Sequence, residues 1–259
     1  MKRLPIIVLA LFTSGIFCAS AWNAHGHSVI AYVAEQNLTP RARKMCHHYL
    51  RHTLPYYASW MDHWRYCPGY EESRGWHGVR VNKNNEIHNP NRTNAITQID
   101  AFRRETKHYR RMSDSTVMEN IKYLIHMVAD VHSPVHMVYY KMPEFRQDTL
   151  TLDGRRMRYH DLLDGSPTRM HKKWTIEQYN AHLESEWGHE KRAVSRGTAE
   201  EWMVELAIDS KRLWKMMPNG SEWNNLSSEN RKGVEHMIER RLYIAGIRLA
   251  TVLNEIFEK

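Results

Sequence analysis

Three residues in one short segment, His126, Asp130 and His136, could hold a metal ion. His126 and Asp130 are four residues apart, and on a helix that spacing makes two side chains neighbours on one face. An imidazole and a carboxylate placed in this way can share one ion, by the geometry that makes paired helical histidines zinc ligands. Pro134 ends the helix, so His136 follows on a redirected backbone. The alternative is a solvated His/Asp pair, but a third candidate ligand so close by favours a metal site.

A second set of candidate ligands lies at Trp22 and His27. Residues 1–21 have the basic start, the apolar stretch and the small-x-small ending of a secretory signal peptide. Cleavage after Ala21 would make Trp22 the first residue. Its α-amino group, with an ordinary pKa of about 7.7–8.0, and its carbonyl oxygen could then chelate a metal together with His27. The alternative is that His27 is an ordinary polar residue near the start of a helix.

The composition agrees with a secreted metalloprotein. The 259 residues are 42% hydrophobic, which excludes a disordered chain, and they include 17 histidines but only 3 cysteines. A net charge of +8 favours anionic partners such as phosphates, nucleic acid or lipid headgroups. The apolar stretch within residues 1–21 is shorter than the ~20 residues that span a bilayer, so we expect no stable membrane anchor. Cys46 and Cys67 could form one disulfide in an oxidising compartment, a question that the sequence leaves open.

The elements that must position these residues are mainly helices. Hydrophobic periodicity predicts helices in which apolar side chains recur every three to four residues. Thr39 with Pro40, and Thr198 with Glu201, are typical of helix starts. The sequence from Thr149 to Gly154 resembles a strand that enters a hairpin. The predicted helices are one after His27, one from Pro40, and those over residues 95–111, 118–131, 198–217 and 229–257. Two stretches, residues 66–94 and 143–170, are less regular. No linker divides the chain, so residues 22–259 are expected to form one mainly α-helical domain.

These motifs together resemble the secreted three-zinc single-strand nucleases, the nuclease S-one/P-one family, which is related in fold to the bacterial zinc phospholipases C. The resemblance implies a single-domain helical bundle of that type with a small β-hairpin. The motifs that carry it are Trp22-x-x-x-Gly26-His27, Leu38-Thr39-Pro40, Ala58-Ser59-Trp60-x-Asp62-x-x-Arg65 and His126-x-x-x-Asp130-x-His132-x-Pro134-x-His136.

The resemblance also implies a ligand set. One zinc ion would be held by Asp62, His77, His126 and Asp130. A second would be held by Trp22, His27 and the shared Asp130, with a hydroxide bridging the pair as nucleophile. A third would be held by His136 and His171. Arg65 would stabilise charge on the phosphoryl group in the transition state.

The sequence departs from the family pattern in two places. The family has an aspartate four residues after its last histidine, but Thr175 stands four residues after His171. The third ion would then be bound weakly, be absent, or be held by a nearby acid such as Asp161 or Asp164. The expected total is therefore two to three zinc ions. Near His77, the aromatic residue and the aspartate that contact a nucleobase in the family are replaced by Gly78 and Arg80.

The sequence therefore predicts a zinc-dependent phosphodiesterase, secreted or periplasmic and monomeric. The expected substrates are single-stranded DNA or RNA, and 3′-nucleotides in addition. Two alternatives remain at this stage. One is a zinc-dependent phospholipase C, which would need an apolar lip beside the site. The other is a zinc-binding homologue with weakened catalysis, which would follow from loss of the carboxylate at the third ion.

Overall fold

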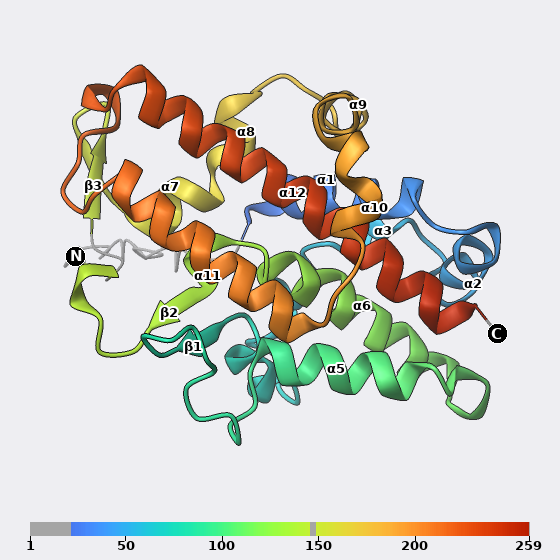
Figure 1. Cartoon of the computed structure of the whole chain (residues 1–259). Helices are drawn as coiled ribbons and strands as arrows, with labels where there is room; N and C mark the ends of the chain where they lie inside the picture. The colour runs from blue at the N-terminus through green and yellow to red at the C-terminus, as the bar shows by residue number, and fades with distance from the viewer. Residues whose placement is uncertain (1–21, 146–148, 259) are drawn as a thin grey trace, which may run out of the picture.

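The structure, a computed structural model, describes residues 22–145 and 149–258, and most of them are helical (Figure 1). The predicted signal peptide lies outside the described residues. The α-helices are α1 (Ala24–Gln36), α2 (Pro40–Leu50), α3 (Leu54–Tyr57), α4 (Trp60–Trp64), α5 (Ala95–Thr106), α6 (Asp114–Asp130), α7 (Tyr159–Asp164), α8 (Ser166–Met170), α9 (Ile176–Trp187), α10 (Lys191–Val194), α11 (Ala199–Met216) and α12 (Ser228–Phe257). Among these residues, no helix combines the length and the apolar character needed to cross a membrane.

Side-chain caps fix where the predicted helices begin. The Thr39 side chain accepts a hydrogen bond from the backbone N–H of Ala42, and Pro40 occupies the first turn of α2. Thr198 and Glu201 form the predicted capping box at the start of α11. Each cap satisfies backbone N–H groups that have no partner within the helix. The mainly α fold and the sequence-based helix starts are confirmed at these positions.

The long helix α12 organises the core. It packs against α1, α2, α6, α9 and α11, and Figure 1 shows it running across the molecule beside α11. The closest approach is at Gly246, where a β-carbon would lie 2.5 Å from the Val33 side chain of α1. Any larger residue at position 246 would therefore push α1 and α12 apart. This contact holds α1, which carries His27, against the centre of the protein.

Helix α6 is more deeply buried than its pattern suggests. The sequence places Ile121, Leu124 and Val128 on an apolar face, with His126 and Asp130 on roughly the opposite side. In the structure every residue from 120 to 130 is buried, because α2, α5 and α12 surround the helix. The solvated His/Asp pair is therefore excluded.

Two short two-stranded sheets complete the described structure. Strand β1 (Val79–Val81) pairs in parallel with β2 (Met137–Tyr139), and β3 (Thr149–Leu152) pairs antiparallel with β4 (Arg155–Arg158). Asp153 and Gly154 connect β3 to β4 with φ angles of 51° and 72°. Positive φ at both positions is the type I′ turn that suits a two-residue hairpin. The predicted hairpin is confirmed.

Some expectations need correction. The helix expected over residues 95–111 ends at Thr106 and is followed by a short 3₁₀ helix. The stretch 143–170, expected to be irregular apart from the hairpin, contains α7 and α8. Cys46 lies buried in α2 and Cys67 follows α4, and both are free thiols, so the structure does not contain the disulfide that the sequence left open.

Candidate metal centre

Asp130, the last residue of α6, lies at the centre of the candidate site. Its carboxylate is fully buried and faces imidazoles from several parts of the chain. Its Oδ2 lies 2.9 Å from Nδ1 of His77 and 3.3 Å from Nε2 of His126, and its Oδ1 lies 3.4 Å from Nε2 of His27. His136 Nδ1 is 3.6 Å from Oδ2. A buried carboxylate is costly unless it is paired or coordinates a metal, so this arrangement fits a shared metal ligand.

The ring of His126 is oriented by the backbone of another segment. Its Nδ1–H donates a hydrogen bond of 2.8 Å to the carbonyl oxygen of Ala58. The Nε2 atom therefore turns toward Asp62 and Asp130, at 3.7 and 3.3 Å. A hydrogen bond that fixes one ring nitrogen and leaves the other facing the centre is the usual support of a histidine ligand.

Helix α1 brings Trp22 and His27 to the same place. His27 lies in the first turns of α1, and its ring stacks on that of His126 with centroids 4.2 Å apart. The buried indole of Trp22 donates its Nε1–H to the carbonyl oxygen of Ala129, at 3.1 Å. Because Ala129 precedes Asp130, Trp22 is anchored beside the centre. The Asn23 N–H also donates to the carbonyl oxygen of Asp164, which ties the start of α1 to α7.

Helix α4 supplies a carboxylate and an arginine. Asp62 and Arg65 are three residues apart, and Nη1 of Arg65 lies 3.4 Å from Oδ1 of Asp62. The same Oδ1 lies 3.7 Å from Nε2 of His126 and 3.9 Å from Nδ1 of His77. The Arg65 guanidinium also lies over the ring of Tyr66 at 5.1 Å. The charge of Arg65 is thus held at the edge of the imidazole cluster.

The β1–β2 pair brings His77 and His136 together. Val79 pairs with Met137, so the histidines that precede the two strands lie side by side, and His136 Nδ1 contacts the carbonyl oxygen of His77. Gly78 makes this approach feasible, because a β-carbon there would lie 2.7 Å from the carbonyl oxygen of His136. A residue with a side chain at position 78 would separate the strands.

Several buried polar atoms of the cluster lack a hydrogen-bond partner and are of the type that binds a metal. Neither ring nitrogen of His27 has a hydrogen-bond partner, and the same is true of Nε2 of His77 and Oδ1 of Asp130. Buried polar atoms without partners are rare in proteins, and a bound ion is one standard explanation. Imidazole nitrogens and carboxylate oxygens are also the donors that zinc prefers, together with thiolates. The residues therefore fit a metal ion.

The electrostatics of the cluster point the same way. Burial, with neighbouring His126 second, lowers the pKa of His27 to about 3, so this ring is neutral. Burial also lowers the pKa of His77. For His126 burial acts in the same direction, but Asp130 and Asp62 outweigh it and raise the pKa to about 9. Burial disfavours the charged form of Asp130, yet His126 and His136 hold its pKa well below the usual value. Without a metal, His27 and His77 are thus neutral beside an ionised Asp130, whereas His126 carries a proton that it would release when a metal binds.

Comparison with known proteins agrees with this geometry. A sequence model of the S1/P1 nuclease family matches residues 22–258. The chain belongs to the S1/P1 nuclease family. The resemblance seen in the motifs is confirmed.

Two curated relatives are similar over part of the chain. Nuclease P1 of Penicillium citrinum and nuclease PA3 of a Penicillium species are each 27% identical over 156 residues. Each match covers 55% of this chain and 55% of the relative. The match therefore spans about half the length of these two relatives.

Within this S1/P1 family chain, the structure forms a third group of ligand-type residues that differs from the expected one. His136 was expected to share an ion with His171, but it groups with His160 and Asp164 of α7. The His136 and His160 rings stack with centroids 5.3 Å apart, and His160 Nδ1 lies 2.6 Å from Oδ2 of Asp164. Asp164, one of the two acids named as possible substitutes for the missing carboxylate, therefore lies beside His136 and His160. The other, Asp161, is half-exposed and pairs with Arg158.

The sequence contains a signal for this group. His160 and Asp164 are four residues apart, the same spacing as His126 and Asp130. The predicted hairpin ends directly before this pair and gives no sign that a helix follows. The spacing alone therefore does not show that the two side chains share a helix face. His171 instead groups with His182 and Glu239. Thr175, which replaces the expected carboxylate after His171, is the N-cap of α9 and accepts a hydrogen bond from the Gln178 N–H.

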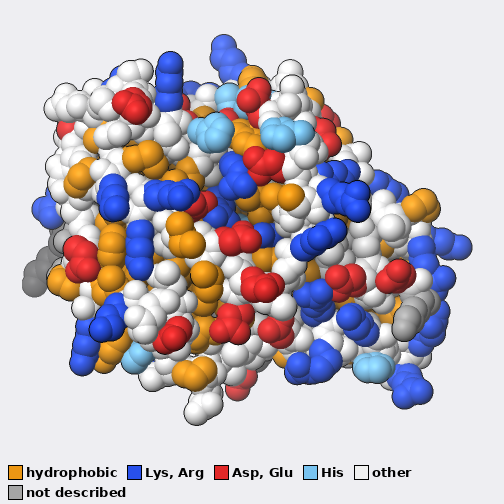
Figure 2. Space-filling view, in the orientation of Figure 1, with side chains coloured by type: hydrophobic (Ala, Val, Ile, Leu, Met, Phe, Trp, Pro, Cys, Tyr) orange, Lys and Arg blue, Asp and Glu red, His pale blue; other side chains and the backbone are white. Residues whose placement is uncertain are grey.

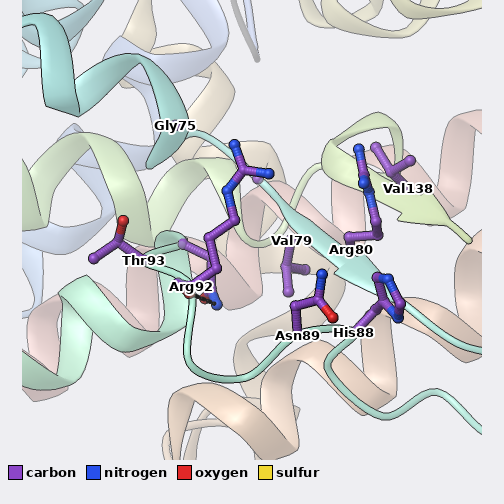
Figure 3. Close-up of a pocket in the computed structure, with 10 residues that line it drawn as sticks. Gly75, Val79, Arg80, His88, Asn89, Arg92, Thr93 and Val138 are labelled. Atoms are coloured by element: carbon purple, nitrogen blue, oxygen red, sulfur yellow. Dashed lines mark hydrogen bonds between the residues drawn. The ribbon is translucent and has the colours of Figure 1, made fainter.

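A cleft opens beside the metal centre, next to Gly78. It has a volume of about 220 Å³ and is formed by β1, the start of β2 and the segment that leads into α5. Figure 3 shows the side chains of Arg80 and Arg92 extending toward the same side of this pocket. No carboxylate lines it. The lining residues are Gly75, Gly78, Val79, Arg80, His88, Asn89, Arg92, Thr93, Asn94 and Val138.

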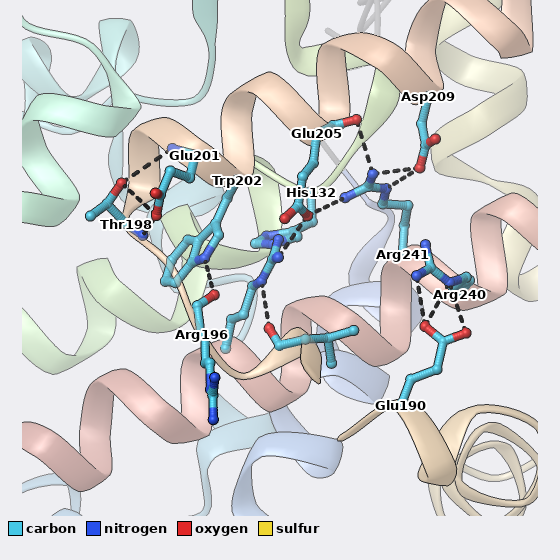
Figure 4. Close-up of polar contacts among 12 residues, drawn as sticks. His132, Glu190, Arg196, Thr198, Glu201, Trp202, Glu205, Asp209, Arg240 and Arg241 are labelled. Atoms are coloured by element: carbon cyan, nitrogen blue, oxygen red, sulfur yellow. Dashed lines mark hydrogen bonds and ion pairs between the residues drawn. The ribbon is translucent and has the colours of Figure 1, made fainter. Parts of the chain in front are cut away.

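A polar network connects the segment after α6 to the helices that pack against it. His132 Nδ1–H donates to the carbonyl oxygen of Val128, and its Nε2 accepts from Arg248 of α12 at 3.0 Å (Figure 4). Burial and the positive charge of Arg248 hold the pKa of His132 well below its usual value, so the ring is neutral. Arg248 also donates to Glu205 and to the carbonyl oxygen of Val194. The network joins the end of α6 to α10, α11 and α12.

We expect Arg248→Ala to destabilise the fold by about 2–3 kcal/mol, because Nε2 of His132 and the Val194 carbonyl would lose a charged donor inside the protein. Denaturant unfolding measures the change. Arg212→Ala is a matched control, because the Arg212 side chain is 69% exposed and pairs with Asp209 only at 3.5 Å. That variant should change stability by about 0.5 kcal/mol or less. Equal stability of the two variants would contradict a supporting role for Arg248.

Proposed function

We propose that the protein is a zinc-dependent phosphodiesterase that cuts single-stranded DNA or RNA and also removes phosphate from 3′-nucleotides. The observation that supports this most is the position of Asp130 among the imidazoles of His27, His77, His126 and His136. A single buried carboxylate with ligands on both sides can serve two adjacent ions, as a two-metal phosphoryl-transfer site needs.

Each proposed ion has its own ligand set. The first ion would be held by Asp62, His77, His126 and Asp130. The second would be held by the α-amino and carbonyl groups of Trp22, by His27 and by Asp130. The third would be held by His136, His160 and Asp164, which replaces the set with His171. When bound, zinc polarises phosphoryl oxygens and generates a nucleophile from water near neutral pH.

Arg65 supplies the remaining positive charge. Its guanidinium is almost fully buried at the edge of the cluster, with Asp62 3.4 Å away and the Tyr66 ring beside it. A guanidinium fixed in this way needs little reorganisation to stabilise charge that develops on a phosphoryl group. Asp62 thus has two functions in the proposal, as a metal ligand and as the group that orients Arg65.

The cleft beside Gly78 favours a polyanionic substrate. Two arginines and a histidine line it, without a carboxylate among the lining residues. A phospholipase C would need an apolar lip at this position, and here Val79 and Val138 are the apolar side chains among lining residues that are otherwise polar or glycine. The cleft therefore supports a nucleic acid substrate over a phospholipid. The second alternative, a weakened homologue, rested on a missing carboxylate at the third ion, and Asp164 beside His136 and His160 would fill that place.

A hydrolysis assay on single-stranded DNA, single-stranded RNA and phosphatidylcholine tests this proposal. We expect phosphodiester cleavage of nucleic acid, lost on chelation and restored by zinc. Hydrolysis of phosphatidylcholine alone would favour the phospholipase alternative. Absence of hydrolysis on every substrate in the zinc-loaded protein would contradict the proposal.

We expect Arg80→Ala and Arg92→Ala to raise KM for single-stranded DNA by roughly 5- to 30-fold each and to leave kcat nearly unchanged, because phosphate contacts remote from the reacting bond contribute binding to substrate and transition state alike. A plot of the logarithm of the binding constant against the logarithm of salt concentration should become less steep in each variant, by about the slope that one phosphate contact contributes. Lys83→Ala, an exposed cation outside the cleft, is the control. Unchanged KM in both arginine variants would exclude the cleft as the substrate path.

We further propose that the protein is exported and that residues 1–21 are removed, because a free amine at Trp22 is part of the proposed ligand set. N-terminal sequencing of the protein recovered from the producing cells tests this. A monomeric state also stays a prediction, which light scattering would check.

A further inference from the structure

A separate group of ligand-type side chains lies where α8, α9 and α12 meet. His171 follows α8, His182 lies on α9 and Glu239 lies on α12. Oε1 of Glu239 is 2.6 Å from Nε2 of His171, and Oε2 is 3.2 Å from Nε2 of His182. One ligand atom from each residue lies within 4.8 Å of the others. The group shares no residue with the centre around Asp130.

The group is held in place and open to solvent. The side chains of His171 and His182 are 21% and 27% exposed, whereas that of Glu239 is 11% exposed. The indole of Trp174 stacks on the His171 ring with centroids 3.6 Å apart, which fixes the ring plane. Figure 2 shows histidine side chains gathered at the surface between α8 and α9. An ion from solution could therefore reach preorganised ligands.

A buried hydroxyl beside the group has no partner. Tyr179 is fully buried, and its ring packs edge-on against the His171 ring at 5.0 Å. Its hydroxyl group has no hydrogen-bond partner among the described residues. Burial, with Glu239 and Glu235 next in order, raises the pKa of this hydroxyl, so both carboxylates lie within electrostatic reach of it. An unsatisfied buried hydroxyl is explained by a missing water or ion nearby.

The simpler explanation is a carboxylate that accepts hydrogen bonds from two histidines. That arrangement would satisfy Glu239 without an ion, and it differs from a metal site in that it predicts no zinc at these residues. Two imidazoles and one carboxylate with an open fourth position are also a standard donor set for zinc. Because the ligands come from segments far apart in sequence, an ion here would cross-link α8, α9 and α12.

We propose that His171, His182 and Glu239 bind a zinc ion that is separate from the ions around Asp130 and that stabilises the packing of α9 on α12. Helix α9 also packs against α1, so the ion secures the support of the helix that carries His27 without entering the reaction. His171 thus keeps its predicted role as a metal ligand but with different partners.

Anomalous diffraction at the zinc edge tests the proposal directly, using crystals of the processed protein dialysed to remove loosely held metal. We expect a peak between Nε2 of His171, Nε2 of His182 and the Glu239 carboxylate. A map without a peak at these three residues would overturn the proposal, whatever it shows around Asp130. The result is therefore independent of whether the proposed nuclease function is correct.

Metal analysis of variants gives a second test in solution. His182→Gln and Glu239→Gln should each lose about one equivalent of zinc per chain and unfold at a lower temperature in zinc than the wild type does. Hydrolysis of single-stranded DNA at moderate temperature should be retained. His189→Gln is the matched control, because the His189 side chain is 74% exposed and outside the group. Folded variants that keep the zinc content of the control would overturn the proposal.

Discussion

Asp130→Asn is expected to lower nuclease activity by about 1,000-fold or more, which corresponds to about 4 kcal/mol of lost transition-state stabilisation. The carboxylate is fully buried and lies within 3.4 Å of His27, His77 and His126. An asparagine has the same shape but no charge, and its amide nitrogen cannot coordinate an ion. Steady-state rates on single-stranded DNA, with zinc content measured on the same sample, check the prediction.

Asp161→Asn is the matched control for this variant. Asp161 lies on α7 near the third group, but its side chain is 40% exposed and pairs with Arg158. The same chemical change there should leave activity within about a factor of two, since exposed ion pairs contribute little. Unchanged hydrolysis by folded Asp130→Asn protein would refute the proposed centre.

A chain that keeps one extra residue before Trp22 is expected to lose about 100-fold in activity, or about 2.7 kcal/mol. The extension converts the terminal amine into an amide, whose nitrogen does not bind zinc at neutral pH. The structure supports a ligand at this position, because Trp22 is buried and donates to the Ala129 carbonyl next to Asp130. The measurements are the rate on single-stranded DNA and the zinc content.

Trp22→Phe with a free amino terminus separates the amine from the side chain. This variant loses the indole hydrogen bond to Ala129 but keeps the amine and the carbonyl group. It should lose stability by about 1 kcal/mol and retain most of its activity when folded. Full activity and full zinc content in the extended chain would exclude the terminal amine as a ligand.

Local sequence rules predicted much of the fold. The starts of α2 and α11 follow from caps at Thr39 and Thr198, and the β3–β4 turn follows from Asp153 and Gly154. The rules missed α9, although Thr175 and Gln178 form a capping box at its start. They do not predict α7 either, because two ligand-type side chains four residues apart, here His160 and Asp164, are not by themselves a sign of a helix.

The grouping of residues in the candidate metal centre was predicted only in part. His27, Asp62, His77, His126 and Asp130 come together as expected. His136 lies beside them but completes its group with His160 and Asp164, and His171 lies in a group with His182 and Glu239. The spacing of acidic residues distinguishes His160 from His171, because Asp164 stands four residues after His160 on α7 whereas Thr175 stands four residues after His171.

The sequence by itself determined the ligand pairs within single helices, because the hydrogen-bond geometry of a helix fixes which side chains four residues apart are neighbours. It also indicated the family, because the residues within each motif, around Trp22 and around His126, lie close together in the sequence. Only the tertiary structure decided which distant histidines share a group. Parallel pairing of β1 with β2 places His77 beside His136, and the packing of α1 on α12 carries His27 to Asp130. These contacts depend on how whole elements fill the core, which no spacing within one segment encodes.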